Sequence, residues 1–347
     1  MKILLPTLYD TRGGSTRVLL AAAEALRPAH AVTVRAPLAE ADERCPALFP
    51  SRPLSSRWRE LAVLPRFAGL VARETLALRR LRPDVIHVHD EPSLYVYGLA
   101  ARSLRPRPFV LWHLHADAGH GRAARLRAAL ADACIRISPH VAPPVGLPSA
   151  LIPNPLPPLA RLPRPDGDPL STLGVVGAVV PRKGQDLAVE ALARLRTAHP
   201  HAHLTLVGPE LDAGFAAGLR RRIAALDLDA AVTFAGERAP ETAFAGIGLA
   251  VFPSRAEAQP LALVEALARG LPIAASDIPA HRALLAGTEA DPDGLVALIP
   301  DSLAAAILAA ARTPPPTNLA ARIRDRHDAT RFAETLRAQM NTFRAAP

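Results

Sequence analysis

Two glutamates stand eight positions apart in the stretch SRAEAQPLALVEALARGLPIAASDIP, residues 254–279. On one continuous helix, Glu257 and Glu265 would lie roughly 80° apart at about 100° per residue, so they would not share a face. Pro260 stands between them, and proline suits the first turn of a helix because its missing N–H has no partner there. We therefore expect Glu257 in a loop above a strand end, and Glu265 about one turn into a helix.

The start of this helix is also an expected anion site. Its first backbone N–H groups, those of Leu261 and Ala262, lie at the positive end of the helix dipole, which favours phosphate. The residues alone leave a second interpretation open, in which Glu257 is a solvated loop carboxylate and Glu265 an exposed helix residue.

Glycines and basic residues follow two other apolar runs. Gly13 and Gly14 in DTRGGSTR would let the backbone approach a ligand closely, although a plain turn is an alternative. Arg182 and Lys183 in GAVVPRKGQD stand before an expected helix, where a solvated basic loop is the alternative. The chain has no GxGxxG sequence, so nothing supports a nicotinamide or flavin dinucleotide site.

Histidines alternate at the ends of two further runs: His87 and His89 in HVHD, and His113 and His115 in HLHAD. Alternate residues of a strand point the same way, so two imidazoles could share a zinc ion and give a metal hydrolase. We expect no metal, because strand-end histidines need not meet in space. Three Asp-x-Asp triplets are expected turns: residues 166–168, 227–229 and 291–293.

The elements that must position these residues are short apolar runs that alternate with helical stretches. Continuous Val, Ile and Leu runs of this kind are typical of parallel sheets covered on both faces. The expected strands are residues 2–6, 31–36, 84–89, 109–115, 134–138, 170–177, 202–208, 231–236, 248–252, 271–276 and 294–300. Ligands bind beyond the carboxyl ends of such strands, which is where the residues named above stand.

The length of 347 residues fits two domains of about 150 to 180 residues. A stretch with seven prolines, residues 152–169, is expected to be a stiff linker. We expect an N-terminal Rossmann-like domain over 1–160, a C-terminal one over 161–316, and a helix over 317–347 that packs back toward the N-terminal domain. Two such α/β domains, each a doubly wound parallel sheet, would face a central cleft.

Composition narrows the class of protein. Half of the residues are hydrophobic, which allows a large core and argues against disorder. The first apolar run is too short for a signal peptide, and no segment has eighteen apolar residues without charge. Cys45 and Cys134 lie far apart without CxxC spacing, which argues against a disulfide framework. We therefore expect a soluble protein of the cytoplasm.

The net charge of +9 is unevenly distributed. Residues 1–155 hold 21 Lys and Arg against 12 Asp and Glu, while residues 156–347 hold 20 against 20. Within the first part, residues 56–83 combine arginines with apolar side chains, a pattern that suits anionic lipid headgroups. A solvated basic helix face is the alternative. Nucleic acid is not an expected partner, because aromatic residues make up only 4% of the chain.

Taken in order, these stretches resemble the retaining nucleotide-sugar glycosyltransferases of family 4, group 1, which have the GT-B fold. The resemblance runs over nearly the whole chain. It rests on the glycine pair, PDVIHVH, the histidine after the fourth run, IPN at 152–154, VPRKG at 180–184, and the glutamate pair followed by GLPIAASDIP. The glutamate pair with its surroundings is the most specific part.

The resemblance implies a role for each matching residue. Lys183 would contact the donor diphosphate, where a cation offsets charge on the leaving group. Glu265 would bind the ribose hydroxyls, and Glu257 would hold the donor sugar near the anomeric carbon. His115 would lie near the sugar. The glycine pair would lie against the diphosphate, and the implied reaction needs no metal or cofactor.

Departures from the family pattern leave an alternative open. Ala178 stands where an arginine often contacts the diphosphate, and Arg182, where an acid is common, would partly replace that charge. Ala258 and Gln259 replace the usual glycine and aromatic residue beside the donor sugar. The alternative is a catalytically weak or inactive nucleotide-sugar-binding protein of the same fold.

The resemblance therefore implies a metal-independent hexosyltransferase. We expect it to use a UDP- or GDP-sugar and a glycan, glycolipid or small-molecule acceptor, in the synthesis of cell-envelope polysaccharide or lipopolysaccharide. The expected partners are the donor, a saccharide or lipid-linked acceptor, and an anionic membrane surface. The expected location is the cytoplasm, at the inner face of the plasma membrane.

Overall fold

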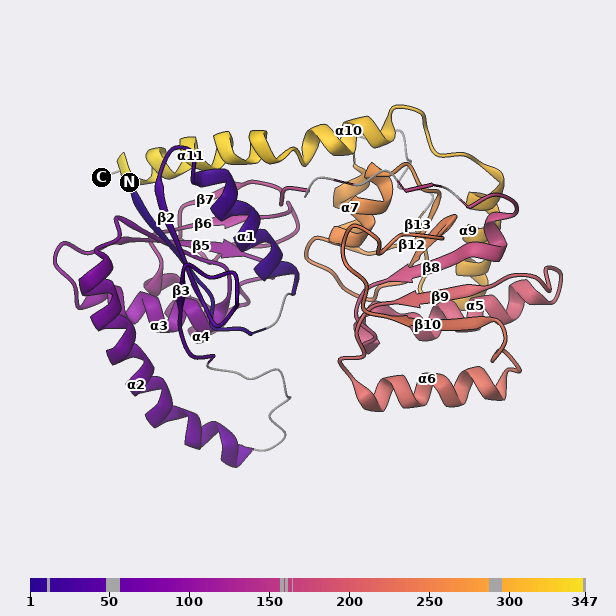
Figure 1. Cartoon of the computed structure of the whole chain (residues 1–347), viewed down its shortest axis with the longest axis horizontal. Coiled ribbons are helices and arrows are strands. Elements are labelled where there is room, and N and C mark those ends of the chain that lie inside the picture. The colour runs from indigo at the N-terminus through magenta and orange to yellow at the C-terminus, as the bar shows by residue number, and fades with distance from the viewer. Residues whose placement is uncertain are drawn as a thin grey trace. The chain divides into compact units, whose positions relative to one another are not determined.

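The computed structural model describes residues 1–10, 13–47, 57–156, 159, 162–163, 165–286 and 295–345, with the backbone alone for 57–65. It divides the chain into two compact units, each built on a parallel sheet (Figure 1). The first unit comprises Met1–Pro155 and His327–Pro347, and the second comprises Leu156–Arg326. The change of unit after Pro155 lies inside the proline-rich stretch 152–169.

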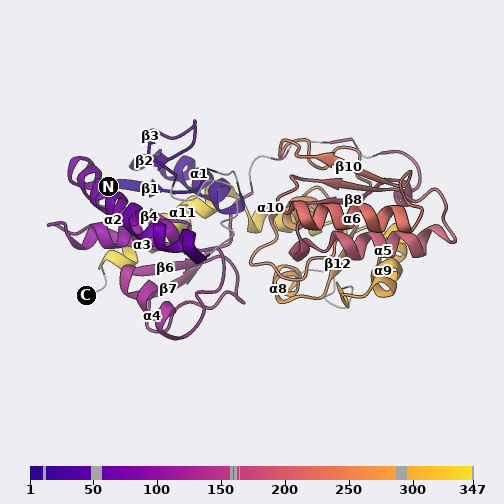
Figure 2. The same ribbon diagram turned by 90° about the horizontal axis from the view of Figure 1, so that it is seen from below.

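The first unit contains a seven-stranded sheet in the order β3-β2-β1-β4-β5-β6-β7, with every pair parallel. Its strands are β1 (Lys2–Pro6), β2 (Ala31–Ala36), β3 (Glu43–Arg44), β4 (Val85–Val88), β5 (Phe109–Leu114), β6 (Ala133–Arg136) and β7 (Ser149–Leu151). Its helices are α1 (Gly14–Leu26), α2 (Arg57–Leu81), α3 (Glu91–Arg102), α4 (Gly121–Leu130) and α11 (Ala329–Ala345). Helices α1 and α11 pack together on one face, and α2, α3 and α4 lie on the other (Figures 1 and 2).

The second unit contains a six-stranded parallel sheet in the order β10-β9-β8-β11-β12-β13. Its strands are β8 (Leu173–Val176), β9 (Leu204–Val207), β10 (Val232–Gly236), β11 (Leu249–Phe252), β12 (Ile273–Ser276) and β13 (Leu295–Val296). Its α-helices are α5 (Gln185–Arg196), α6 (Ala213–Ala225), α7 (Leu261–Ala268), α8 (Pro279–Leu285), α9 (Pro300–Arg312) and α10 (Leu319–Arg326). Two 3₁₀ turns, η1 (Pro169–Thr172) and η2 (Pro181–Lys183), flank β8.

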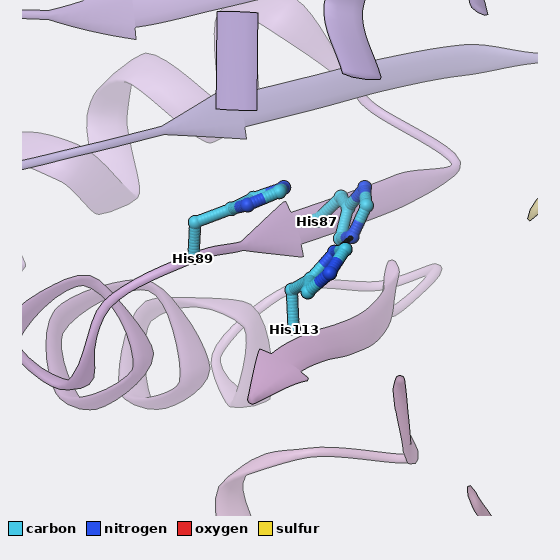
Figure 3. Close-up of side chains that lie close together, drawn as sticks. All are labelled: His87, His89 and His113. Atoms are coloured by element: carbon cyan, nitrogen blue, oxygen red, sulfur yellow. Dashed lines mark hydrogen bonds between the residues drawn. The ribbon is translucent and has the colours of Figure 1, made fainter. Parts of the chain in front are cut away.

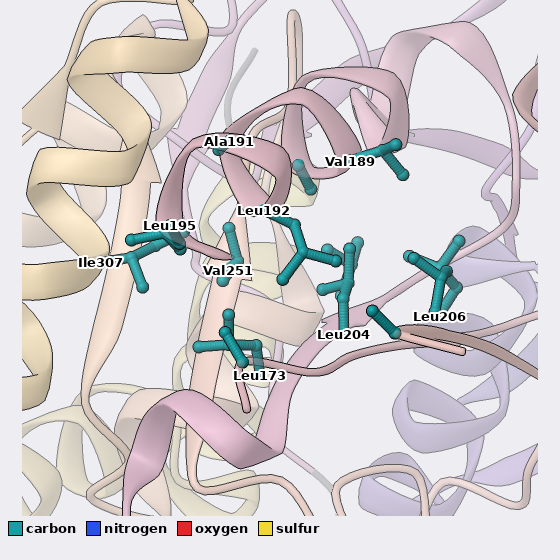
Figure 4. Packing of buried hydrophobic residues seen from close by; sticks show 14 of the residues in the cluster. Leu173, Val189, Ala191, Leu192, Leu195, Leu204, Leu206, Val251 and Ile307 are labelled. Carbon is teal, nitrogen blue, oxygen red and sulfur yellow. The ribbon is translucent and has the colours of Figure 1, made fainter. Parts of the chain in front are cut away.

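Both faces of this second sheet are covered, which explains its continuous apolar strands. Along β11, Leu249 and Val251 belong to one buried cluster, while Ala250 and Phe252 belong to the other. Successive strand side chains point to opposite faces, so each face needs its own helices. Figure 4 shows the first cluster, in which side chains of α5 and Ile307 of α9 meet the sheet.

The single helix expected over residues 317–347 is two helices in the structure. The chain leaves α10 at Arg326, and Asp328 begins a new helix because its Oδ1 accepts from the backbone N–H of Arg331 at 2.8 Å. Phe332, Leu336 and Met340 of α11 are buried in the core of the first unit, whereas α10 belongs to the second.

Among the described helices, none has the length and apolar character needed to cross a bilayer. Residues 227–229 lie in a turn, and Asp168 of the triplet 166–168 caps η1. The third Asp-x-Asp triplet, residues 291–293, lies outside the described residues.

Candidate functional site

In the second unit, hydrogen bonds and an ion pair join the loops that follow β8 and β11. The backbone N–H of Arg255 donates to the carbonyl of Arg182 at 2.8 Å. The Arg255 guanidinium pairs with Asp186 at 2.6 Å and also donates to the Pro181 carbonyl. The sequence does not reveal this pairing, because Arg255 and Asp186 stand 69 positions apart. The pairing of Arg255 with Asp186 holds VPRKG, residues 180–184, beside the loop that carries Glu257.

Glycine is required where these loops meet. Gly184 has a φ of +71°, and a Cβ there would lie 2.0 Å from the carbonyl oxygen of Pro253. Gly177 has a φ of +153°, and an added Cβ would lie 3.3 Å from Cε of Lys183. Both positions favour glycine, because the backbone is left-handed and a neighbour approaches closely.

Glu257 lies between two cations in this pair of loops. Its Oε1 accepts from Nζ of Lys183 at 2.6 Å, and its Oε2 accepts from Nη1 of Arg182 at 2.7 Å. Ser254 Oγ also donates to Oε1, at 2.9 Å. The Glu257 side chain is only 6% exposed, so the alternative of a solvated loop carboxylate is wrong. Three residues singled out from the sequence, Arg182, Lys183 and Glu257, therefore meet at one point.

The charges around Glu257 keep it ionised. Burial raises the pKa of its carboxyl, but the charges and hydrogen bonds of Lys183 and Arg182 outweigh burial and hold the pKa below its ordinary value of 4.5. The carboxylate thus neutralises cations that could otherwise bind a phosphate. An anionic ligand at Lys183 would compete with Glu257 for that lysine.

Two buried residues that sequence analysis missed support the Glu257 loop. Ser276 Oγ donates to the Ser254 carbonyl at 2.6 Å, and Nδ1 of His281 donates to the Ser276 carbonyl at 2.7 Å. Burial lowers the pKa of His281, which favours the neutral ring. The available signal was their position, with Ser276 as the last residue of β12, the strand next to β11, and His281 in the helix that follows.

The second glutamate of the pair lies on α7, which begins at Leu261, directly after Pro260. This confirms that a helix starts between Glu257 and Glu265. The N–H groups of Leu261 and Ala262 lie in the first turn, where an α-helix supplies no acceptor. Glu265 is only 3% exposed, so the alternative of an exposed helix glutamate is wrong. It is buried because α7, LALVEALA, is apolar on nearly all sides and packs against α10.

In the first unit, four histidines gather at the ends of β4 and β5, and Figure 3 shows three of them, His87, His89 and His113. His87 Nε2 lies 3.2 Å from His113 Nδ1, and His89 Nδ1 lies 3.2 Å from His115 Nε2. The strands are parallel, with His87 paired to Leu111, so alternate residues of both strands share one face. The histidines at these two strand ends therefore do meet, contrary to the reason given above for expecting no metal.

Burial governs the protonation of these rings. It lowers the pKa of His87 to about 3 and that of His115 to about 4. It also lowers the pKa of His89 and His113 well below the usual range. At neutral pH all four imidazoles are therefore uncharged, and each carries one N–H and one lone pair.

A cavity of 570 Å³ lies beside the histidines, wholly within the first unit. Its walls include four aromatic side chains, three of the histidines and two acids: Tyr9, Phe67, Tyr95, Trp112, His89, His113, His115, Asp90 and Glu91. Ser15 also lines it, so the segment that begins α1 borders the cavity.

The glycine pair stands at the start of that segment. Gly13 precedes α1 with an ordinary φ of −63°, and Gly14 is the first helical residue. No heavy atom of the described chain lies within 4 Å of a Cβ built at Gly13. The local fold therefore leaves open space at Gly13, and neither its φ nor a close neighbour requires a glycine there.

Comparison with protein families gives two matches that follow each other along the chain. A family described as "Glycosyltransferase Family 4" matches residues 12–143, and one described as "Glycosyl transferases group 1" matches residues 171–313. The first match lies within the first unit and the second within the second unit. No curated protein sequence matches the chain.

Several solved structures are similar to this one over nearly the whole chain. Anabaena Alr3699/HepE in complex with UDP-glucose has a TM-score of 0.76 and 20% identity, over 99% of this chain and 100% of that one. Sucrose-phosphate synthase (tll1590) from Thermosynechococcus elongatus has a TM-score of 0.74 and 20% identity, over 100% of both chains. The lipopolysaccharide outer core galactosyltransferase WaaB, in its apo form, has a TM-score of 0.67 and 16% identity, over 99% of both chains. These similarities identify the fold as GT-B.

Proposed function

Because this chain belongs to the group 1, family 4 glycosyltransferases, we propose that it transfers a hexose-type sugar from a UDP- or GDP-sugar with retention of the anomeric configuration. The similar Anabaena structures hold UDP-glucose or UDP, which makes UDP-sugars the first donors to test. The second unit binds the donor and the first receives the acceptor.

The observation that carries this proposal is the meeting of Lys183, Arg182 and Glu257 at the ends of β8 and β11. In an open parallel sheet this edge is where ligands bind. Two cations next to the first turn of a helix suit a diphosphate, since both supply donors to its oxygens. A carboxylate beside them suits the hydroxyls of the attached sugar.

The ion pair between Glu257 and Lys183 implies an order in which contacts change when the donor binds. The donor diphosphate takes over Lys183 and Arg182, because its charge exceeds that of one carboxylate. Glu257 is then released toward the sugar, where its negative charge faces the positive charge that develops at the anomeric carbon. Glu265 holds the ribose hydroxyls, and the N–H groups of Leu261 and Ala262 face the diphosphate.

Arg182 compensates in this proposal for the alanine at position 178. Its side chain is 52% exposed, and its guanidinium donates to Glu257 and to the Ala256 carbonyl, within reach of the same ligand as Lys183. The alternative function, nucleotide-sugar binding with weak or no turnover, is favoured by Ala178 itself. Intact Lys183, Glu257 and Glu265 favour the enzyme.

The acceptor is proposed to be a saccharide, free or lipid-linked, in the synthesis of a cell-envelope polysaccharide or lipopolysaccharide at the inner face of the plasma membrane. The aromatic walls of the first-unit cavity support a saccharide, because Tyr95 and Trp112 offer apolar faces beside the acids Asp90 and Glu91. His115 lines the same cavity.

A donor screen tests the proposal. The protein is incubated with UDP- and GDP-sugars, with and without a saccharide acceptor, and released nucleoside diphosphate is measured. Turnover with one donor is expected, and it should survive EDTA, because Lys183, Arg182 and a helix start take the place of a divalent ion. Donor binding without release would favour the binding protein. Loss of turnover on chelation, with recovery in Mn²⁺, would show that the transfer needs a metal.

A further inference from the structure

We propose that the first unit binds one transition-metal ion through His87, His89 and His113, with Zn²⁺ as the natural occupant. One nitrogen from each ring lies within 4.8 Å of the other two. Figure 3 shows the three rings projecting from β4 and β5 over the same region. Imidazole is a ligand that zinc prefers, and the proposal is independent of the transfer reaction.

The spacing of the rings fits a shared ion. Two nitrogens bound to one tetrahedral zinc at about 2.0–2.1 Å stand about 3.3 Å apart. His87 Nε2 and His113 Nδ1 form a hydrogen bond at 3.2 Å, which is also the separation of two zinc ligands, so an ion would replace the proton between them. The ring centroid of His89 is 4.5 Å from that of His113, and its ligand nitrogen lies within 4.8 Å of the other two.

The rings also have more nitrogens than partners. Within the part of the chain that the structure describes, no hydrogen-bond partner exists for Nδ1 of His87 or for Nε2 of His89, while His113 also interacts with the side chain of Asn154. These residues are only 0–2% exposed, and a buried polar atom without a partner is costly. The other nitrogen of the His89 ring is bonded to His115, so Nε2 of His89 is the unpartnered atom that an ion shared with His87 Nε2 and His113 Nδ1 would satisfy.

The surroundings provide an entry path and a second layer of contacts. His89 and His113 line the 570 Å³ cavity, so an ion and its fourth ligand, a water molecule, can enter from there. His115 lies 3.2 Å from Nδ1 of His89 and would fix the orientation of that ring. Asp90, 8% exposed, follows His89 and lines the same cavity.

An ion at this position would join β4 to β5 at the ends that face the cavity. It binds the folded unit only, since the unfolded chain does not bring the three histidines together. Zinc therefore raises the melting temperature of the protein by mass action. The structure assigns the ion to the stability of the first unit, which leaves the metal-independent transfer by Lys183 and Glu257 unchanged.

Metal uptake by the full chain is the test. Metal-free protein is titrated with Co²⁺ and then with Zn²⁺, and the bound metal is quantified after gel filtration. We expect one equivalent, visible absorption bands of a tetrahedral Co²⁺ site, and three imidazole nitrogens in X-ray absorption at the zinc edge. Melting temperature should rise with Zn²⁺, while turnover should be the same with and without it.

Matched variants locate the ion. His113→Gln and His89→Gln each remove one ligand and should weaken Zn²⁺ binding by about 100-fold or more. The control is His199→Gln with His201→Gln, a surface pair of the second unit whose rings are 6.0 Å apart. This control should bind one equivalent with unchanged affinity.

Three results would overturn the proposal. One is absence of metal uptake by the wild-type chain, which would leave water as the partner of the rings. Another is uptake that disappears in the His199 and His201 control, which would place the ion on the surface. The third is equal affinity in His113→Gln and wild type. If His113→Gln does not fold, the Zn²⁺ affinity of His89→Gln and the number of imidazole ligands in the wild-type X-ray absorption spectrum test the site instead. Unchanged affinity in His89→Gln, or fewer than three imidazole nitrogens, would then overturn the proposal.

Discussion

At the scale of single residues, the main finding is that Glu257 already occupies the cations proposed to bind the donor. The sequence predicts a loop glutamate and a helix glutamate because proline and the apolar period are local signals. It does not predict that Glu257 pairs with Lys183, because that contact joins positions 74 residues apart. Nor does it predict the burial of Glu265, which depends on the packing of α7 against α10.

The two glutamates should respond differently to substitution by glutamine. Glu257→Gln should lower kcat and tighten binding of free UDP or GDP, because Lys183 no longer has a competing carboxylate. Glu265→Gln should mainly weaken donor binding, by about 10- to 150-fold for the loss of a charge-assisted hydrogen bond worth about 1.5–3 kcal/mol. Steady-state kinetics and calorimetry with the nucleotide measure both. Equal effects of the two changes on affinity alone would contradict this division of roles.

Acid should weaken the cluster around Glu257. Its folded-state pKa lies below 4.5, so the stabilisation is fully present above pH 4.5 and is lost as the pH falls through the folded-state pKa. Urea unfolding followed by circular dichroism between pH 6 and pH 3 should show a smaller loss for Glu257→Gln than for wild type. Glu241→Gln, on the exposed surface, is the control and should match wild type. Identical slopes for all three would refute the prediction.

At the scale of elements, the sequence predicts strands well where both faces are buried. The runs at β1, β2, β4 and β5 are recognised because a strand covered on both faces needs consecutive apolar residues. The edge strands β3 and β7 are missed, since Glu43–Arg44 and Ser149–Leu151 are short and carry little apolar pattern. The break between α10 and α11 is missed because a single aspartate produces it.

Gly184 lies where two loops cross, so replacing it should disturb the backbone at that point. Gly184→Ala should destabilise the protein by at least about 1–2 kcal/mol, the cost of a left-handed backbone for alanine, and the contact with Pro253 adds to this. Because the same loop carries Lys183, donor affinity should fall as well. Urea unfolding and donor titration measure the two effects.

Gly218→Ala is the matched control for this change. Gly218 lies inside α6, where an added Cβ would meet only the Nη2 of Arg221, at 3.8 Å. Alanine there should stabilise the protein by about 0.5–1 kcal/mol, because glycine is unfavourable inside a helix. If the two changes gave the same effect, the crossing of the loops would have no special role.

At the scale of the whole molecule, the charge is concentrated in one unit. The first unit holds 24 Lys and Arg against 14 Asp and Glu, and the second holds 17 against 18. The proline-rich stretch 152–169 contains both the change of unit after Pro155 and the expected boundary after residue 160. Of the basic residues proposed for a lipid surface, Arg66 and Arg73 on α2 are exposed, while the side chains of residues 57–65 lie outside the described part of the chain.

The charge difference predicts reversible binding to anionic membranes. Full-length protein should sediment with anionic liposomes at low salt and be released at high salt, because each basic residue near the bilayer contributes about 1 kcal/mol. Arg66→Glu with Arg73→Glu should weaken binding, whereas Arg221→Glu with Arg312→Glu, exposed in the second unit, should not. Absence of binding even at low salt would make a soluble acceptor the better proposal.

The division of the C-terminal helices also sets the order in which the two units can be completed during synthesis. The second unit is one continuous segment, Leu156–Arg326, and all of it leaves the ribosome before α11 does. The first unit needs Phe332, Leu336 and Met340 to close its core, although its strands are made first. The face of α1 that packs against α11 therefore stays uncovered while the second unit is translated. The unit that is made first is thus the last to have its apolar core covered, and it is exposed to aggregation for the longest time.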